Sequence, residues 1–219
     1  MKQKNTGTLW SAVGLLAAFA IWTALLSFVD VRAIGPGDSS VGFAAVNGFF
    51  HRLTGVHMVL YHITDWLGLV PVAFAMGFAI LGLAQWIKRK QIRKVDPSIL
   101  ILGGFYLLVL AFYLLFEQVV INYRPVYING YLEVSYPSST TMLVLTVMPT
   151  AVMQLRRRIQ NPVWRKWVTF CIAAFVVFMV AGRLISGVHW FSDIVGGALL
   201  SAGLVMLYRF ACNSPFSVV

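Results

Sequence analysis

Residues 98–121 read SILILGGFYLLVLAFYLLFEQVVI, and Glu117 is the single charged side chain in the stretch. About 20 consecutive apolar residues are enough for an α-helix to cross the roughly 30 Å hydrocarbon core of a bilayer. The stretch therefore predicts a membrane-spanning helix. Further apolar stretches predict five more spanning helices, at about residues 9–29, 64–87, 138–158, 167–185 and 188–209.

The composition agrees with a protein that uses lipid as its solvent. Of the 219 residues, 59% are hydrophobic and 11% are charged, whereas about a quarter of a typical soluble domain is charged. We therefore predict an all-α, polytopic membrane protein in which residues 1–219 form a single domain of six transmembrane helices. The amphipathic segment 41–53, after the first helix, is expected to lie at the membrane interface as a short helix.

The basic residues are distributed unevenly between the two sides of this predicted bundle. The formal net charge is +10, and 13 of the 17 Lys and Arg residues lie beside every second gap between apolar stretches. This bias is typical of cytoplasmic loops, so both termini are expected in the cytoplasm. No aromatic and basic groove pattern accompanies the charge, which argues against a nucleic acid partner.

Polar residues gather at three helix ends on the opposite side. Ionisable residues at membrane depth are candidates for function. The three groups are Asn122-Tyr123-Arg124-Pro125, then Tyr136-Pro137-Ser138-Ser139-Thr140-Thr141, then Gly182-Arg183 with His189 and Asp193.

Each group has a chemical use for an anion. Arg124 and Arg183 offer planar forks of donors that match phosphate oxygens. Pro137 near the first helical position leaves backbone N–H groups free at a helix N-terminus, which is an anion site. His189 and Asp193 are four residues apart and would share a helical face, where the carboxylate holds one imidazole nitrogen protonated and the other is free to attack. Taken singly, these features are more often an interfacial anchor, a helix cap and a structural pair, so the prediction depends on their occurrence together.

The order of these residues resembles the three-part signature of the type 2 phosphatidic acid phosphatase superfamily, whose last motif is matched here as Arg183, five residues, His189, three residues, Asp193. The resemblance implies a metal-independent lipid phosphatase without a cofactor. It also implies that His189 forms a phosphohistidine, that Asp193 orients it, and that Arg124, Arg183, Ser138 and Ser139 hold the phosphate.

Two positions depart from the signature. Glu117 stands where the family usually has a Lys, and Thr140 stands where it has the His that protonates the leaving group. Undecaprenyl pyrophosphate is accordingly the favoured substrate, ahead of phosphatidylglycerophosphate and phosphatidic acid, because its leaving group needs little protonation. Two alternatives are an impaired protein that binds or carries phospholipid and a lipid phosphotransferase.

The resemblance and the charge bias together predict where the protein works. The expected location is a bacterial cytoplasmic membrane, with the active site on its extracytoplasmic face and with no obligatory protein partner. Either His62 or Asp65 could line the same external cleft.

Overall fold

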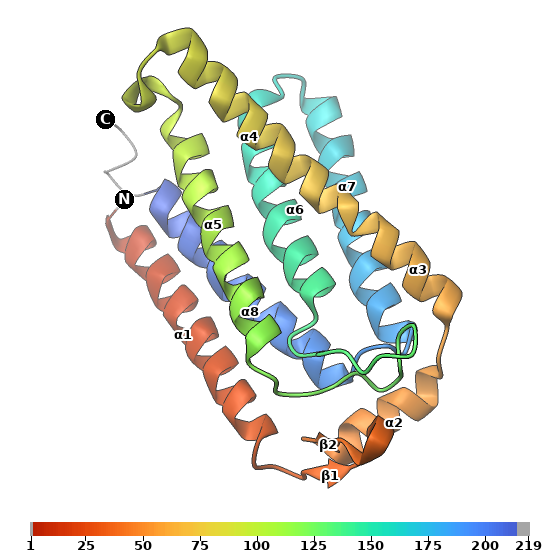
Figure 1. The fold of residues 1–219 in the computed structure, drawn as a ribbon. Coiled ribbons are helices and arrows are strands. Elements are labelled where there is room, and N and C mark those ends of the chain that lie inside the picture. The colour runs from red at the N-terminus through yellow and green to blue at the C-terminus, as the bar shows by residue number, and fades with distance from the viewer. Residues whose placement is uncertain (1, 214–219) are drawn as a thin grey trace.

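The computed structural model describes residues 2–213, with side chains from residue 6 onward, and this part of the chain is predominantly helical (Figure 1). Its α-helices are α1 (Lys2–Leu26), α2 (Ala44–Thr54), α3 (Met58–Leu67), α4 (Leu69–Arg89), α5 (Pro97–Gln118), α6 (Ser139–Arg158), α7 (Pro162–Ile185) and α8 (Phe191–Cys212). Two short antiparallel strands, β1 (Arg32–Ala33) and β2 (Ser40–Val41), flank the 3₁₀ helix η1 (Pro36–Asp38), and a second 3₁₀ helix, η2 (Ile92–Lys94), joins α4 to α5.

Several of these helices are long and apolar enough to cross a bilayer, which makes this a multi-pass membrane protein. Within the described residues, five such segments are Thr6–Leu26, Met58–Arg89, Pro97–Gln118, Pro162–Ile185 and Phe191–Cys212. The sixth predicted span, α6, falls outside this set because Thr146, Thr150 and Gln154 lower its hydropathy. These polar side chains are buried in the bundle and hydrogen-bonded there. The count of six spans stays a prediction.

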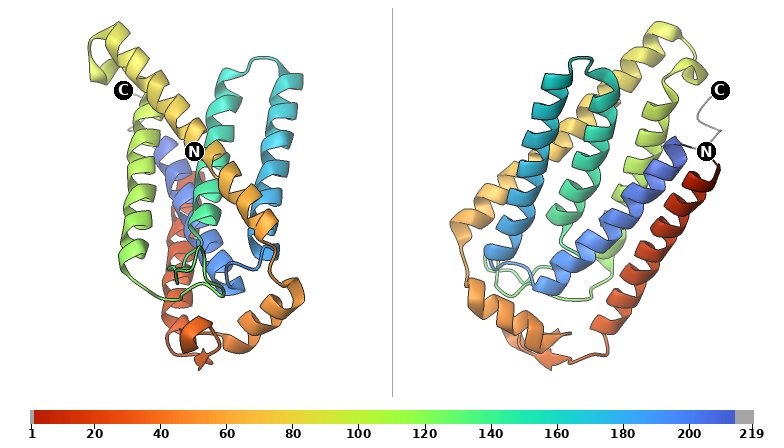
Figure 2. Two further views of the ribbon diagram at one scale, coloured as in Figure 1. Left: turned by 45° about the vertical axis from the view of Figure 1, so that its right-hand side comes forward. Right: turned by 180° about the vertical axis from the view of Figure 1, so that it is seen from behind.

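Helix α8 crosses the bundle between α1 and α6 (Figure 2). Two of its glycines allow neighbouring groups to approach the helix closely, as small residues do in membrane helix packing. A Cβ at Gly196 would lie 2.4 Å from the ring of Tyr136, and a Cβ at Gly203 would lie 2.8 Å from Leu16. Tyr136 precedes α6, so this packing fixes the start of α6 against the start of α8.

The second predicted span differs from the expectation. We predicted a helix over residues 64–87, but the helix begins at Met58 and is interrupted at Gly68. Pro71 has no N–H to donate to the carbonyl of Leu67, which explains an interruption at this point. The earlier start has a functional consequence, because α3 carries Tyr61 and Asp65 to the end of the bundle where the polar residues gather.

The two ends of the bundle differ in character (Figure 1). The basic runs that close α4 and α6 lie at one end, together with the start of α1. The loop 119–138 lies at the other end, and α2 lies across that end. A helix thus occupies most of the segment that we expected at the membrane interface.

The charge distribution gives a testable topology. The test uses a variant whose Cys171 and Cys212 are replaced by Ser. In this background, a single cysteine at Asn129 should react with a membrane-impermeant maleimide added to intact cells. The reason is that Asn129 is exposed in the loop 119–138, on the side with few basic residues. A single cysteine at Lys90 should react only after permeabilisation. Labelling of position 90 in intact cells would contradict the predicted orientation.

Candidate active site

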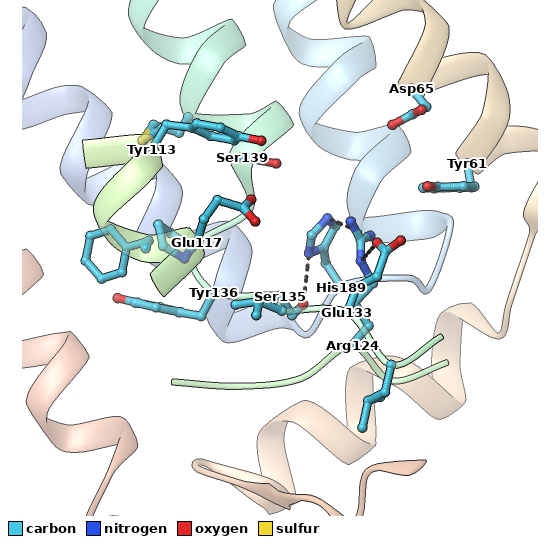
Figure 3. Close-up of a pocket in the computed structure, with 15 residues that line it drawn as sticks. Tyr61, Asp65, Tyr113, Glu117, Arg124, Glu133, Ser135, Tyr136, Ser139 and His189 are labelled. Atoms are coloured by element: carbon cyan, nitrogen blue, oxygen red, sulfur yellow. Dashed lines mark hydrogen bonds and ion pairs between the residues drawn. The ribbon is translucent and has the colours of Figure 1, made fainter. Parts of the chain in front are cut away.

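Six parts of the chain meet at the end of the bundle opposite the basic runs (Figure 3). They are α3, the end of α5, the loop 119–138, the start of α6, the end of α7 and the start of α8. The loop folds back on itself, since the N–H of Arg124 donates to the carbonyl of Glu133 and the N–H of Ser135 donates to that of Asn122. A cavity of about 560 Å³ opens between these segments, and His189 and Arg124 lie in its wall.

His189 lies in the turn between α7 and α8 and is 3% exposed. Its Nε2 lies 2.9 Å from Nη2 of Arg183 and 3.3 Å from Nη1 of Arg124. A guanidinium only donates, so Nε2 must be the acceptor and carries no proton. Burial, together with the charges of Arg124 and Arg183, lowers the pKa of His189 well below its usual value. The site therefore contains a neutral imidazole with a lone pair on Nε2.

The other imidazole nitrogen is held through a serine. Nδ1 of His189 lies 3.0 Å from Oγ of Ser135, and that hydroxyl donates to Oδ2 of Asp193 at 2.5 Å. The direct separation between Nδ1 and Oδ2 is 3.8 Å, which is too long for a hydrogen bond. Nδ1–H therefore donates to Ser135, which in turn donates to Asp193. Asp193 lies beside the imidazole as expected, but its hydrogen bond to the ring passes through Ser135.

Asp193 is fully buried in the first turn of α8. Its carboxylate accepts from the backbone N–H of Trp190 at 2.9 Å and from Nδ2 of Asn122 at 3.1 Å. The expectation that His189 and Asp193 share one helical face is corrected here, because α8 begins at Phe191 and not near residue 188. The helix starts later because Asp193 caps it, by accepting from Trp190 at the N-cap position.

The two arginines approach each other beside the imidazole. Arg124 lies 3.0 Å from Glu133, measured from Nε to Oε2, and Arg183 lies 3.7 Å from Asp65, measured from Nη1 to Oδ1. The ring of Tyr61 lies near both guanidinium groups, at 5.9 Å from Arg124 and 5.0 Å from Arg183. Among the described residues, the buried Nε of Arg183 has no hydrogen-bond acceptor. Donors thus converge on one place with capacity left for an oxyanion.

The other predicted residues divide into two groups. Pro137, Ser139 and Glu117 line the cavity. Ser138 is fully buried and caps α6, since its Oγ accepts from the backbone N–H of Thr141 at 3.5 Å. The hydroxyl of Thr141 donates to the same Oγ at 3.0 Å. Thr140 is not among the residues that line the cavity; it lies near Gly68, where a Cβ would be 3.7 Å from its Cγ2.

Several neighbours of the site were not predicted to act in it. Ser135 and Glu133 belong to the loop 119–138, where no helical spacing relates them to the other residues of the site. Tyr61 belongs to α3 but precedes residue 64, where the predicted helix begins. Asn122 belongs to a predicted group but had no assigned role. Asp65, one of the two alternatives for the cleft, lines the cavity, whereas His62 is not among the lining residues. No group of three His, Cys, Asp or Glu residues within residues 2–213 could hold a metal ion.

Comparison with known proteins agrees with this geometry. Residues 118–213 match the family model of the PAP2 superfamily, and this segment contains Arg124, Ser135, Arg183, His189 and Asp193. This part of the chain is therefore similar in sequence to that superfamily. Its fold is similar to the crystal structure of a transmembrane PAP2-type phosphatidylglycerolphosphate phosphatase from Bacillus subtilis, at 20% identity and a TM-score of 0.53, over 91% of this chain and 94% of the other. No curated protein matches the chain.

The bridging serine gives a sharp prediction. Ser135→Ala should lower phosphate release from a lipid phosphate by about 10- to 100-fold, because removal of a buried hydrogen-bond partner costs roughly 1–3 kcal/mol. The KM should change little, since Ser135 contacts the imidazole and the carboxylate and not the guanidinium groups. Ser201→Ala is a matched control, as Ser201 is also buried and hydrogen-bonded but bonds to Met142 away from His189. Equal turnover in the two variants would exclude a role for Ser135 in positioning His189.

Proposed function

We propose that this protein hydrolyses a membrane lipid phosphate through a phosphohistidine formed on His189. The observation that carries the proposal is the unprotonated Nε2 of a buried imidazole, directed to the place where two buried guanidinium groups converge. A phosphate bound there would have a nucleophile and two charge-assisted donors within reach.

The proposed first step is attack of Nε2 on phosphorus. A P–N bond forms, the P–O bond to the lipid breaks, and the lipid oxygen departs with the electron pair and takes a proton from solvent. Arg124 and Arg183 stabilise the charge on the phosphoryl oxygens. The imidazole becomes positive as it bonds to phosphorus, and the chain from Nδ1–H through Ser135 to Asp193 stabilises that charge.

The proposed second step is hydrolysis of the phosphohistidine. Water attacks phosphorus, the P–N bond breaks, phosphate is released and neutral His189 is restored. Transfer to the hydroxyl of another lipid would use the same intermediate, so a phosphotransferase differs only in the acceptor.

The proposed location is the extracytoplasmic face of a bacterial plasma membrane, with both termini in the cytoplasm. It is supported by the residues that line the cavity, many of which belong to the loop 119–138. This loop lies at the end of the bundle opposite the basic ends of α4 and α6 (Figure 1). Basic residues of that kind favour the cytoplasmic surface.

The identity of the lipid depends first on the leaving group. Thr140 cannot act as a general acid near neutral pH, so a substrate that leaves without a proton is favoured. A lipid phosphate has a second pKa near roughly 6, whereas an alkoxide leaves as a much stronger base. This argument supports a lipid pyrophosphate such as undecaprenyl pyrophosphate. The bacterial protein of similar fold is a phosphatidylglycerolphosphate phosphatase, which makes that phosphomonoester the first comparison.

The nucleophile can be tested directly. Purified protein given ³²P-labelled lipid phosphate and quenched in alkali should carry a base-stable, acid-labile label on His189, and His189→Ala should carry none. His57→Ala is the matched control, because His57 is exposed and its ring bonds to the carbonyl of Thr54. A label that persists in His189→Ala would refute the proposed intermediate.

Thr140 provides a second test. General acid catalysis contributes about 10²–10⁴-fold and is worth more for basic leaving groups. If residue 140 limits proton transfer, Thr140→His should raise turnover of phosphatidic acid strongly and that of a lipid pyrophosphate much less. An equal gain on both would show that Thr140 limits positioning instead. No turnover of either substrate in either form, with vanadate still bound, would favour a phospholipid binder over an enzyme.

A further inference from the structure

Glu117 is a carboxylate in the cavity without a basic partner. It lies in the last turn of α5 and faces the same cavity as His189 (Figure 3). Its side chain interacts with the hydroxyl of Tyr113, one turn earlier in the helix. Among the side chains of residues 6–213, no Lys, Arg or His lies within ion-pair distance of Glu117. The other two carboxylates of the cavity, on Asp65 and Glu133, each lie beside an arginine.

The site therefore has a net negative charge, which is unfavourable for a purely anionic ligand. Two guanidinium groups and a neutral imidazole accompany four carboxylates, which gives a formal charge of −2 before any phosphate binds. The carboxylates are those of Asp65, Glu117, Glu133 and Asp193. A bound phosphate makes the site still more negative. The second phosphate of a pyrophosphate, if it extended toward α5, would meet Glu117 without a compensating cation, and like charges in a partly enclosed site repel.

We propose that Glu117 binds a cationic group of the substrate, so that the cavity accepts a zwitterionic phosphoester whose alcohol carries an ammonium group two carbons from the ester oxygen. The phosphate would contact Arg124 and Arg183, and the ammonium would contact the carboxylate of Glu117. The cavity, at about 560 Å³, lies within the usual range for a small-molecule site. This inference rests on the proposed function, because it places the phosphate beside His189.

The same ligand would relieve the lack of a general acid. An ammonium group near the ester oxygen withdraws electrons and lowers the basicity of the departing alcohol, so less depends on protonation by residue 140. The departures at Glu117 and Thr140 then have one explanation, whereas the pyrophosphate substrate accounts for Thr140 alone. The two substrates make opposite predictions: the carboxylate of Glu117 should weaken the binding of a pyrophosphate and strengthen the binding of an ammonium phosphoester.

Two soluble probes of nearly equal shape separate charge from size. O-phosphoethanolamine and n-propyl phosphate differ in a terminal ammonium in place of a terminal methyl. Each would be titrated against vanadate bound to full-length protein in nanodiscs. The wild type should bind O-phosphoethanolamine about tenfold more tightly, the gain expected from one charge-assisted contact in a half-open site.

Variants of residue 117 then test the assignment. Glu117→Gln should remove the preference for O-phosphoethanolamine, and Glu117→Lys should reverse it. Asp38→Asn is the matched control, because Asp38 lies in η1 outside the cavity, and it should keep the wild-type ratio. The readout is a ratio of two affinities in the same variant, so a partial loss of folded protein does not change it.

The outcomes separate this inference from the proposed function. Equal affinity of the wild type for both probes, or an unchanged ratio in Glu117→Gln, would overturn the ammonium site while leaving the phosphatase proposal intact. Tighter binding of inorganic pyrophosphate than of O-phosphoethanolamine would support the pyrophosphate substrate instead. If vanadate itself does not bind, both proposals fail.

Discussion

The strongest constraint on this structure is the burial of two positively charged arginines, both of which lie within hydrogen-bond distance of Nε2 of His189. Arg183 is 1% exposed and Arg124 is 8% exposed, and placing two like charges together away from water is costly unless both are compensated. Asp65 and Glu133 each compensate one guanidinium, and the face of Tyr61 lies near both. An oxyanion bound between the arginines would stabilise the arrangement further. The free protein thus holds its donors in place before a phosphate arrives, and such preorganisation is the usual source of electrostatic catalysis.

The rest of the fold can be understood as the means of holding these groups. Arg124 is fixed by the folded-back loop 119–138, and Arg183 is fixed by the last turn of α7. Asp193 both caps α8 and accepts from Ser135, so the start of that helix cannot move without disturbing the imidazole. The packing of the Tyr136 ring on Gly196 ties the start of α6 to the same point. Long apolar helices thus form a rigid frame, and the residues of the candidate site lie at the ends of these helices.

The sequence was most informative where local rules decide the structure. Apolar length predicted the spanning helices, and the spacing of Arg183, His189 and Asp193 predicted that these residues meet. It was less informative where tertiary contacts decide. Nothing in the spacing indicates that Ser135 lies between Nδ1 and the carboxylate, because that position depends on how a long loop folds back. The sequence does not predict the interruption at Gly68, because a proline such as Pro71 is also compatible with one continuous membrane helix.

The two departures from the family signature are best understood by their positions in the site. Arg124, Arg183, His189 and Asp193 match the signature, and in the proposed mechanism they bind the phosphate and supply and orient the nucleophile. Glu117 lies on the α5 wall of the cavity, and Thr140 lies outside it near Gly68. Glu117 therefore changes the wall of the cavity beside the proposed phosphate site, whereas Thr140 removes the general acid of the signature. The proposed ammonium phosphoester would place its positive charge beside the carboxylate of Glu117, whereas a lipid pyrophosphate would have to direct its second phosphate away from α5.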